Sequence, residues 1–237
     1  MEKLVVTTLL LNLFAILTIR LRPRLFKVKL FRPMVKNFRL SLLPAAAFML
    51  GFLIFLGLSV WAAYSGNRAL AVMAKAVLLL GCLGWLLLLP NAGYLITELN
   101  MTHRQEDEHE VPIWYDIVSI LSFALSGIAN TLLNLAALEY AILIIWDPSP
   151  LTLGFYWALQ GIAVLALILV SIGVYLGRAI RFNSWDVLHP GRFWQKMTTH
   201  FRQPGNLKNS LLFVLFHSFF FLILYVAWDL PGLFPIG

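Results

Sequence analysis

Apolar runs long enough to cross a lipid bilayer fill most of this chain, and they restrict its fold more than any other feature. The 237 residues are 60% hydrophobic and only 12% charged, which leaves too few polar groups to cover a soluble domain. Only helices and closed barrels satisfy their backbone in lipid, and barrel strands are short and alternating. Long continuous runs of about 20 apolar residues therefore predict an all-α polytopic membrane protein. We expect six transmembrane helices, near residues 4–19, 40–64, 69–89, 117–146, 152–176 and 210–228.

The distribution of lysine and arginine predicts how these helices are oriented. Eight basic residues and no acid lie in segment 20–39, and six basic residues lie in segment 177–209, whereas only Lys3 and Arg68 fall on the opposite side. The positive-inside rule then places the basic segments in the cytoplasm and both termini outside. Most basic residues follow the first run instead of preceding it, which favours an N-terminal anchor over a cleavable signal peptide. The shortness of that run leaves open whether it fully spans the bilayer.

The net charge of +7 comes mainly from residues beside the apolar runs. Residues in such positions contact anionic lipid headgroups, so we expect membrane lipids as partners at the basic loops, and no binding to nucleic acid. The predicted location is the cell membrane (the inner or plasma membrane), as a multi-pass protein. An oligomer or another membrane protein is a further candidate partner.

The residues that commonly hold metals do not form a recognised pattern here. Cys82 is the only cysteine and lies inside the third run, which excludes an intrachain disulfide and argues against a cysteine-based zinc site. His103 and His109 lie among acidic residues but lack the i, i+4 spacing of a helical zinc pair, so a hydrated acidic loop is the plainer interpretation. We predict no metal site, and the sequence indicates no particular cofactor. Without repeats or long linkers, residues 1–237 form a single membrane domain.

Three short polar blocks stand at the ends of apolar runs. They are PNAGYLITE at residues 90–98, WYD at 114–116 and GRAIRFNSWD at 177–186. The predicted topology puts all three at one membrane face, where their carboxylates, guanidinium groups and amides converge. Helix capping, interfacial anchoring and internal salt bridges explain any one of these residues. As a set, however, they predict a site at this face.

If the helix of the first block continues past Pro90 with a kink, three of its polar residues lie on the same face of the helix. Asn91, Tyr94 and Glu98 are then spaced i, i+3 and i+7, which places them on one side of the helix. In the third block, Arg178 and Arg181 share a helical face in the same way.

Together the blocks LPNAGYLITEL, PIWYD and GRAIRFNSWDVL resemble those of a bacterial family of multi-spanning membrane proteins catalogued as a domain of unknown function. That family shows LPNxxYxxT[DE], a WYD block and GRxxRxNSWD. The resemblance covers residues 86–188, a family-like core within the membrane domain, and implies a fold and a site but no activity. Position 98 has Glu where Asp is expected to be common, which changes the reach of the carboxylate. The positions carried over are Asn91, Tyr94, Thr97, Glu98, Trp114, Tyr115, Asp116, Arg178, Arg181, Asn183, Ser184, Trp185 and Asp186.

One hypothesis is a site at the cytoplasmic face that binds or modifies a lipid headgroup or an isoprenoid phosphate. Arg178 and Arg181 would bind phosphate, and Asn91 and Asn183 would orient the substrate. Three carboxylates are the candidate catalytic groups: Asp116, Glu98 and Asp186. Four aromatic residues complete the candidate binding set: Tyr94, Trp114, Tyr115 and Trp185.

Two alternatives remain open. Polar residues inside the bilayer are costly, and Glu139 and Gln160 have matching depths in the hairpin of the fourth and fifth runs. With His217 in the last run, they suggest a small transporter or channel-like protein, although hydrogen bonds between helices are the plainer interpretation. Asn130 and Asn134 are the other polar residues at this depth. The second alternative is a membrane scaffold or assembly factor. Between these hypotheses, the sequence does not decide whether the protein is an enzyme.

Overall fold

The computed structural model describes residues 1–100, 111–146, 152–182 and 189–228, and this part of the chain is helical without a strand. The predicted all-α membrane class is confirmed, because six helical segments of the described chain are long and apolar enough to cross a membrane. Those segments are Glu2–Phe26, Arg32–Ser65, Arg68–Leu99, Ile113–Trp146, Leu153–Ile180 and Asn206–Ala227.

Four of these segments are single α-helices, namely α1 (Glu2–Phe26), α2 (Arg32–Ser65), α5 (Ile113–Trp146) and α8 (Asn206–Ala227). The third segment consists of α3 (Arg68–Leu88), the short α4 (Pro90–Gly93) and the 3-10 helix η1 (Tyr94–Asn100). The fifth consists of α6 (Leu153–Tyr175) and a π-helical turn, η3 (Leu176–Ile180). One further helix, α7 (Pro190–Phe201), has no counterpart among the six expected helices.

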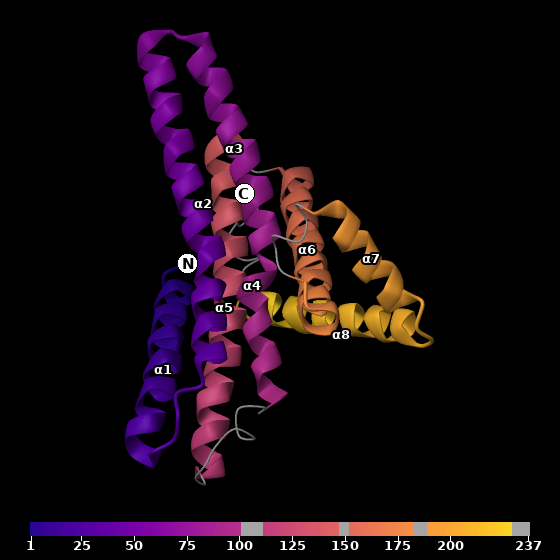
Figure 1. Cartoon of the computed structure of the whole chain (residues 1–237). Helices are drawn as coiled ribbons and strands as arrows, with labels where there is room; N and C mark the ends of the chain where they lie inside the picture. The colour runs from indigo at the N-terminus through magenta and orange to yellow at the C-terminus, as the bar shows by residue number, and fades with distance from the viewer. Residues whose placement is uncertain (101–110, 147–151, 183–188, 229–237) are drawn as a thin grey trace.

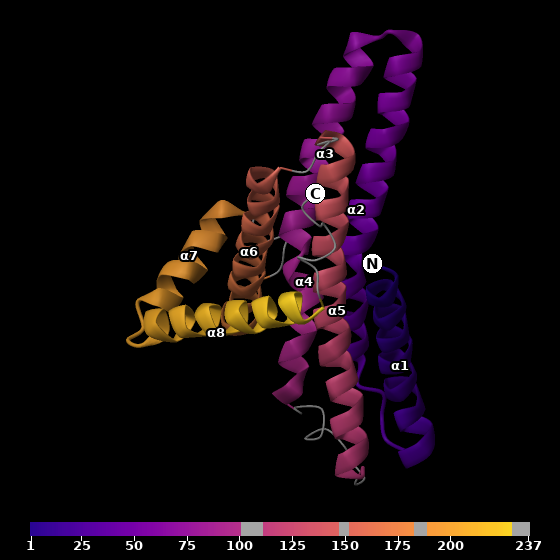
Figure 2. The ribbon, with the colours of Figure 1, turned by 180° about the vertical axis from the view of Figure 1, so that it is seen from behind.

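Helix α5 is the central element of the fold (Figure 1). It contacts α1, α2, the α4–η1 segment and α6, and it is buried on most of its sides. Helices α2 and α3 form a long hairpin that extends past the end of α5, consistent with a length of about 51 Å for the 34 residues of α2. Seen from both sides, α8 runs across α6 rather than alongside it (Figures 1 and 2). The α6–α7–α8 unit therefore forms a wall beside the main bundle, and α6 and α8 share a hydrophobic core with α3 and α5.

The basic segment expected as a loop from residue 20 to residue 39 is mostly helical, and that boundary was wrong. Helix α1 continues through Pro23 to Phe26, and α2 begins at Arg32. The chain turns at Lys27, whose φ of 56° is left-handed and ends the helix. Charge ends an apolar run but does not end a helix, so hydropathy alone placed the boundary too early.

The third segment stays helical past Pro90, but it changes type. Proline has no backbone N–H, and the chain tightens so that Ala92 N–H donates to the Leu89 carbonyl at 3.0 Å. Two glycines let this segment lie close to its neighbours. A Cβ at Gly127 of α5 would lie 2.7 Å from Leu95 Cβ, and a Cβ at Gly173 of α6 would overlap the ring of Pro90.

Asn130 and Asn134 connect α5 to three other helices. Asn12 of α1 donates to Asn130 Oδ1 at 2.7 Å, and Asn130 Nδ2 lies 3.3 Å from Ser41 Oγ of α2. Trp85 Nε1 of α3 donates to Asn134 Oδ1 at 2.8 Å. Such bonds hold helices together in lipid. The structure thus places these two intramembrane asparagines at helix–helix contacts.

Candidate functional site

A cavity of about 880 Å³ lies between the main bundle and the α6–α7 wall. Its walls come from α2, the end of α3, the α4–η1 segment, α6 with η3, and α7. Six lining residues have polar side chains: Lys36, Asn37, Asn91, Tyr94, Arg178 and Arg181. The remaining lining is mostly apolar: Leu40, Leu86, Leu87, Pro90, Leu169, Ile172, Gly173, Leu176, Gly177, Phe182 and Phe193. The lining is therefore amphipathic, because it combines cations with aliphatic and aromatic groups.

The first and third polar blocks meet at this cavity. The ring of Tyr94 lies against Gly177, where an added Cβ would be 3.3 Å from Tyr94 Cε2. Asn91 enters the lining because the chain stays helical after Pro90, and Pro90 itself fits over Gly173. The structure thus brings together four of the candidate binding residues, namely Asn91, Tyr94, Arg178 and Arg181.

The two arginines are positioned by an unusual end to α6. Arg178 lies within the π-helical turn η3, a type of turn often found at functional sites. Arg181 has a φ of 59°, which is uncommon for a residue other than glycine. Its left-handed conformation reverses the chain, and Phe182 N–H donates to the Leu176 carbonyl at 3.2 Å. Both arginines and Phe182 line the same cavity, Arg178 from within η3 and the other two from the turn that ends it.

The positive charge of the lining is not neutralised by acids of the described chain. Lys36, Arg178 and Arg181 have exposed side chains, and no carboxylate in the described ranges pairs with them. The ring of Phe182 stacks on Phe193 of α7 at 4.6 Å between centroids, which closes the wall on that side. The cations are thus available to an anionic ligand.

Glu98 lies behind the cavity instead of lining it. Its Oε1 accepts a hydrogen bond of 2.6 Å from Nδ2 of Asn37, and Asn37 is a lining residue. Thr97, its neighbour in the first block, donates its hydroxyl to the Tyr94 carbonyl at 2.8 Å. Both residues hold lining residues in place, so Glu98 acts on the cavity through Asn37.

The WYD block lies elsewhere. Asp116 is fully buried, and its Oδ1 accepts from Nε of Arg22 at 2.8 Å, with Nη2 of the same arginine 3.4 Å from Oδ2. Tyr115 donates its hydroxyl to the Thr18 carbonyl at 2.7 Å, whereas Trp114 is exposed. The block therefore joins α5 to α1, and the structure pairs Asp116 with Arg22 instead of with Arg178 or Arg181. Sequence reasoning assigned Arg22 to membrane topology and so missed this partner.

Glu139 and Gln160 do meet, through a residue that the sequence reasoning did not select. The hydroxyl of Tyr225 lies 2.6 Å from Glu139 Oε1 and 2.9 Å from Gln160 Oε1. His217 lies apart from them: its ring stacks on Phe213 at 3.6 Å, and Nδ1 is 3.1 Å from the Phe213 carbonyl. Tyr225 lies within the last expected run, residues 210–228, and its polar hydroxyl group inside an apolar run was the feature of the sequence that could have identified it.

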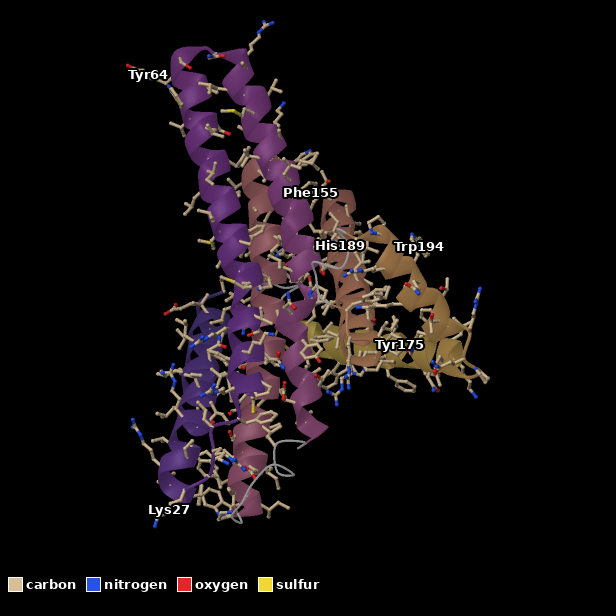
Figure 3. The ribbon with its side chains drawn as sticks, viewed as in Figure 1. Lys27, Tyr64, Phe155, Tyr175, His189 and Trp194 are labelled. Carbon is tan, nitrogen blue, oxygen red and sulfur yellow. The ribbon has the colours of Figure 1, made fainter. Side chains whose placement is uncertain are left out.

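A second polar contact joins the α6–α7–α8 unit. Figure 3 shows Tyr175 where the end of α6 meets α8, and its hydroxyl lies 2.8 Å from Nε2 of His200 on α7. Asn206 at the start of α8 donates Nδ2 to the His200 carbonyl at 2.9 Å. The three helices are therefore fastened at one corner, which fixes the outer wall of the cavity.

Several candidate residues lie outside the described ranges, namely Asn183, Ser184, Trp185, Asp186, His103 and His109. Among the residues that the structure describes, no group of three or more His, Cys, Asp or Glu side chains is placed to hold a metal ion.

The fold and the six apolar helices define a multi-pass, all-α integral membrane protein. Residues 37–224 match the model of a family described as "Protein of unknown function (DUF1361)", and since this is most of the chain, the protein belongs to that family. No curated protein and no solved structure matches the chain. The match extends beyond the core of residues 86–188 on both sides and includes every described lining residue of the cavity except Lys36.

Proposed function

We propose that this protein binds, in the amphipathic cavity, a membrane ligand with an anionic headgroup, either a phospholipid or an isoprenoid phosphate. The observation that carries the proposal is the lining itself, which combines three cations, Lys36, Arg178 and Arg181, with a largely apolar surface. A phosphate group would bind the cations, and an apolar tail would lie along the leucines. The volume of about 880 Å³ is at the upper end of the range for small-molecule sites.

Each polar lining residue has a distinct part in this proposal. The planar guanidinium groups of Arg178 and Arg181 suit two-pronged hydrogen bonding to phosphate oxygens, while Lys36 adds a point charge. The amides of Asn37 and Asn91 supply neutral hydrogen bonds that fix orientation. Tyr94 lies beside Gly177, so its ring forms a wall between the headgroup and the protein interior.

The cavity is proposed to open at the cytoplasmic face. Its cations lie within or beside the two segments that concentrate the basic residues of the chain, residues 20–39 and 177–209. Such concentrations are typical of cytoplasmic ends of membrane helices. The anionic lipids of the cytoplasmic leaflet are then the ligands available there.

Binding fits the described lining better than chemical modification of the ligand. The lining residues of the described chain include no carboxylate, histidine or cysteine, which are the usual acid–base and nucleophilic groups. Asp116 is buried against Arg22, and Glu98 is bonded to Asn37. A modification reaction would depend on Asp186, which lies outside the described residues. The transport hypothesis has less support, because no described contact joins His217 to Glu139; the His217 ring stacks on Phe213.

Replacing Arg178 or Arg181 by glutamine is expected to weaken the binding of anionic lipid about tenfold each, because a lost charge-assisted hydrogen bond costs roughly 1.5 kcal/mol or more. Binding would be measured with the purified protein in detergent, using a phosphatidylglycerol probe and a polyisoprenyl phosphate probe, with zwitterionic phosphatidylcholine as the reference of zero net charge. A preference for one of the two anionic probes identifies the source of the phosphate.

The matched control is Arg24→Gln, because Arg24 is an exposed cation of α1 outside the cavity lining. It should leave the affinity for both anionic probes unchanged. Equal losses in Arg24→Gln and Arg178→Gln would show that surface charge in general attracts the lipid, and would overturn the proposed site. Equal affinity for phosphatidylcholine and for the anionic probes would do the same.

A further inference from the structure

Away from the cavity, three helices meet at a buried polar cluster. Glu139 of α5, Gln160 of α6 and Tyr225 of α8 are respectively 1%, 8% and 1% exposed. The phenol oxygen of Tyr225 lies 2.6 Å from Glu139 Oε1 and 2.9 Å from Gln160 Oε1. Glu139 is seven residues from the end of α5, so the cluster lies about 10 Å from that end, inside the apolar span. None of the three lines the cavity described above.

The two hydrogen bonds of the Tyr225 hydroxyl group need two donated protons, and the phenol supplies only one of them. The phenol of Tyr225 has a single proton, so it can donate to only one of its two oxygen neighbours. It must therefore accept a hydrogen bond from the other. An amide oxygen cannot donate, whereas a protonated carboxyl group can. With these atoms in place, the chain runs from Glu139 O–H to Tyr225, and from Tyr225 O–H to Gln160 Oε1.

The ionised form of Glu139 requires the reverse arrangement. A half-turn of the Gln160 amide would let Nε2 donate to Tyr225, and Tyr225 would then donate to the carboxylate. Glu139 Oε2 is buried and has no hydrogen-bond partner within the described ranges, and no cation of those ranges pairs with it. An unpaired charge in an apolar span strongly destabilises the protein, whereas an unpaired carbonyl oxygen of a neutral acid destabilises it much less.

We propose that Glu139 is a proton-binding site inside the membrane domain, where the neutral acid donates to Tyr225 and Tyr225 donates to Gln160. On losing the proton to solvent, the carboxylate accepts from Tyr225, and rotation of the Gln160 amide supplies the donor that Tyr225 then needs. Both states keep two hydrogen bonds among the three residues, so proton exchange does not break the contact of α8 with α5 and α6. Tyr156, one turn before Gln160 on α6, is the other titratable group interacting with Tyr225. This inference does not depend on the proposed ligand site.

Infrared difference spectroscopy of the full chain in lipid nanodiscs, wild type minus Glu139→Gln, tests the proposal. Near neutral pH we expect the wild type to have the carbonyl stretch of a protonated carboxylic acid, and the variant to lack it. Raising the pH should replace this band by carboxylate bands, and lowering the pH should restore it. If the bands lost in Glu139→Gln are those of an ionised carboxylate at every pH, the proposal is overturned.

Two further variants keep the test decisive. Tyr225→Phe removes the acceptor of the carboxyl proton, so the carboxylic acid band should move to higher frequency. An unmoved band would contradict the proposed hydrogen-bond chain, even if Glu139→Gln failed to fold. Glu2→Gln is the control, because Glu2 is exposed at the start of α1 and should account only for carboxylate bands.

Discussion

Replacing Asp116 by asparagine is expected to destabilise the folded protein by about 3–5 kcal/mol, because it removes the carboxylate that pairs with the buried guanidinium group of Arg22. The two side chains are 0% and 1% exposed, so solvent cannot compensate for the loss. The loss would be measured as a shift in the unfolding midpoint when detergent-solubilised protein is titrated with a denaturing detergent.

The double variant Arg22→Met, Asp116→Leu should recover most of that stability, since a buried ion pair replaced by apolar groups is often neutral. Arg24→Met, on the exposed side of the same helix, should change the midpoint little. The folded fraction of Asp116→Asn should bind anionic lipid as the wild type does. Lost binding at full stability would instead give Asp116 a role in the ligand site.

Replacing Gly173 by alanine is expected to lower the free energy of unfolding by about 1–3 kcal/mol, because the added methyl group overpacks the site. Its Cβ would overlap the ring of Pro90, so either α6 or the α4–η1 segment must move. Because Asn91 follows Pro90 directly, the movement should also weaken lipid binding. Thermal unfolding and the lipid-binding assay on the same preparation would report both effects.

Gly161→Ala is the matched control, because Gly161 lies on the same helix with nothing within 4 Å of an added Cβ. There alanine should be neutral or slightly stabilising, since it favours helix by up to about 1 kcal/mol over glycine. If the two variants behaved alike, the close approach of Pro90 to α6 would not be what the glycine is needed for.

The fold class could be predicted from hydropathy alone, because long apolar runs have very few solutions in lipid. Boundaries could not, as α1 shows: it continues seven residues beyond Ile19, and Arg22 within that extension is buried. Hydropathy scores a residue by type and has no access to its partner. A charged residue that pairs with another residue inside the fold is therefore mistaken for the end of a transmembrane helix.

The candidate site divides in the same way. Asn91, Tyr94, Arg178 and Arg181 could be grouped from the polar blocks, and the structure places all four at one cavity. Asp116 could not be separated from them, because a shared membrane face does not specify which helices are neighbours. Lys36 and Asn37 lie outside the three blocks, so grouping residues by block did not place them in the site.

The pairing of Arg22 with Asp116 has a practical consequence for any shortened form of this protein. The family match begins at residue 37, so a fragment cut to that boundary would omit α1 while retaining its partners Asp116 and Tyr115. Such a fragment would lose the Arg22 guanidinium that pairs with Asp116, and it would uncover the face of α5 that α1 normally contacts. Its instability would say nothing about the cavity. A shortened form of the protein should therefore retain α1 together with the matched region.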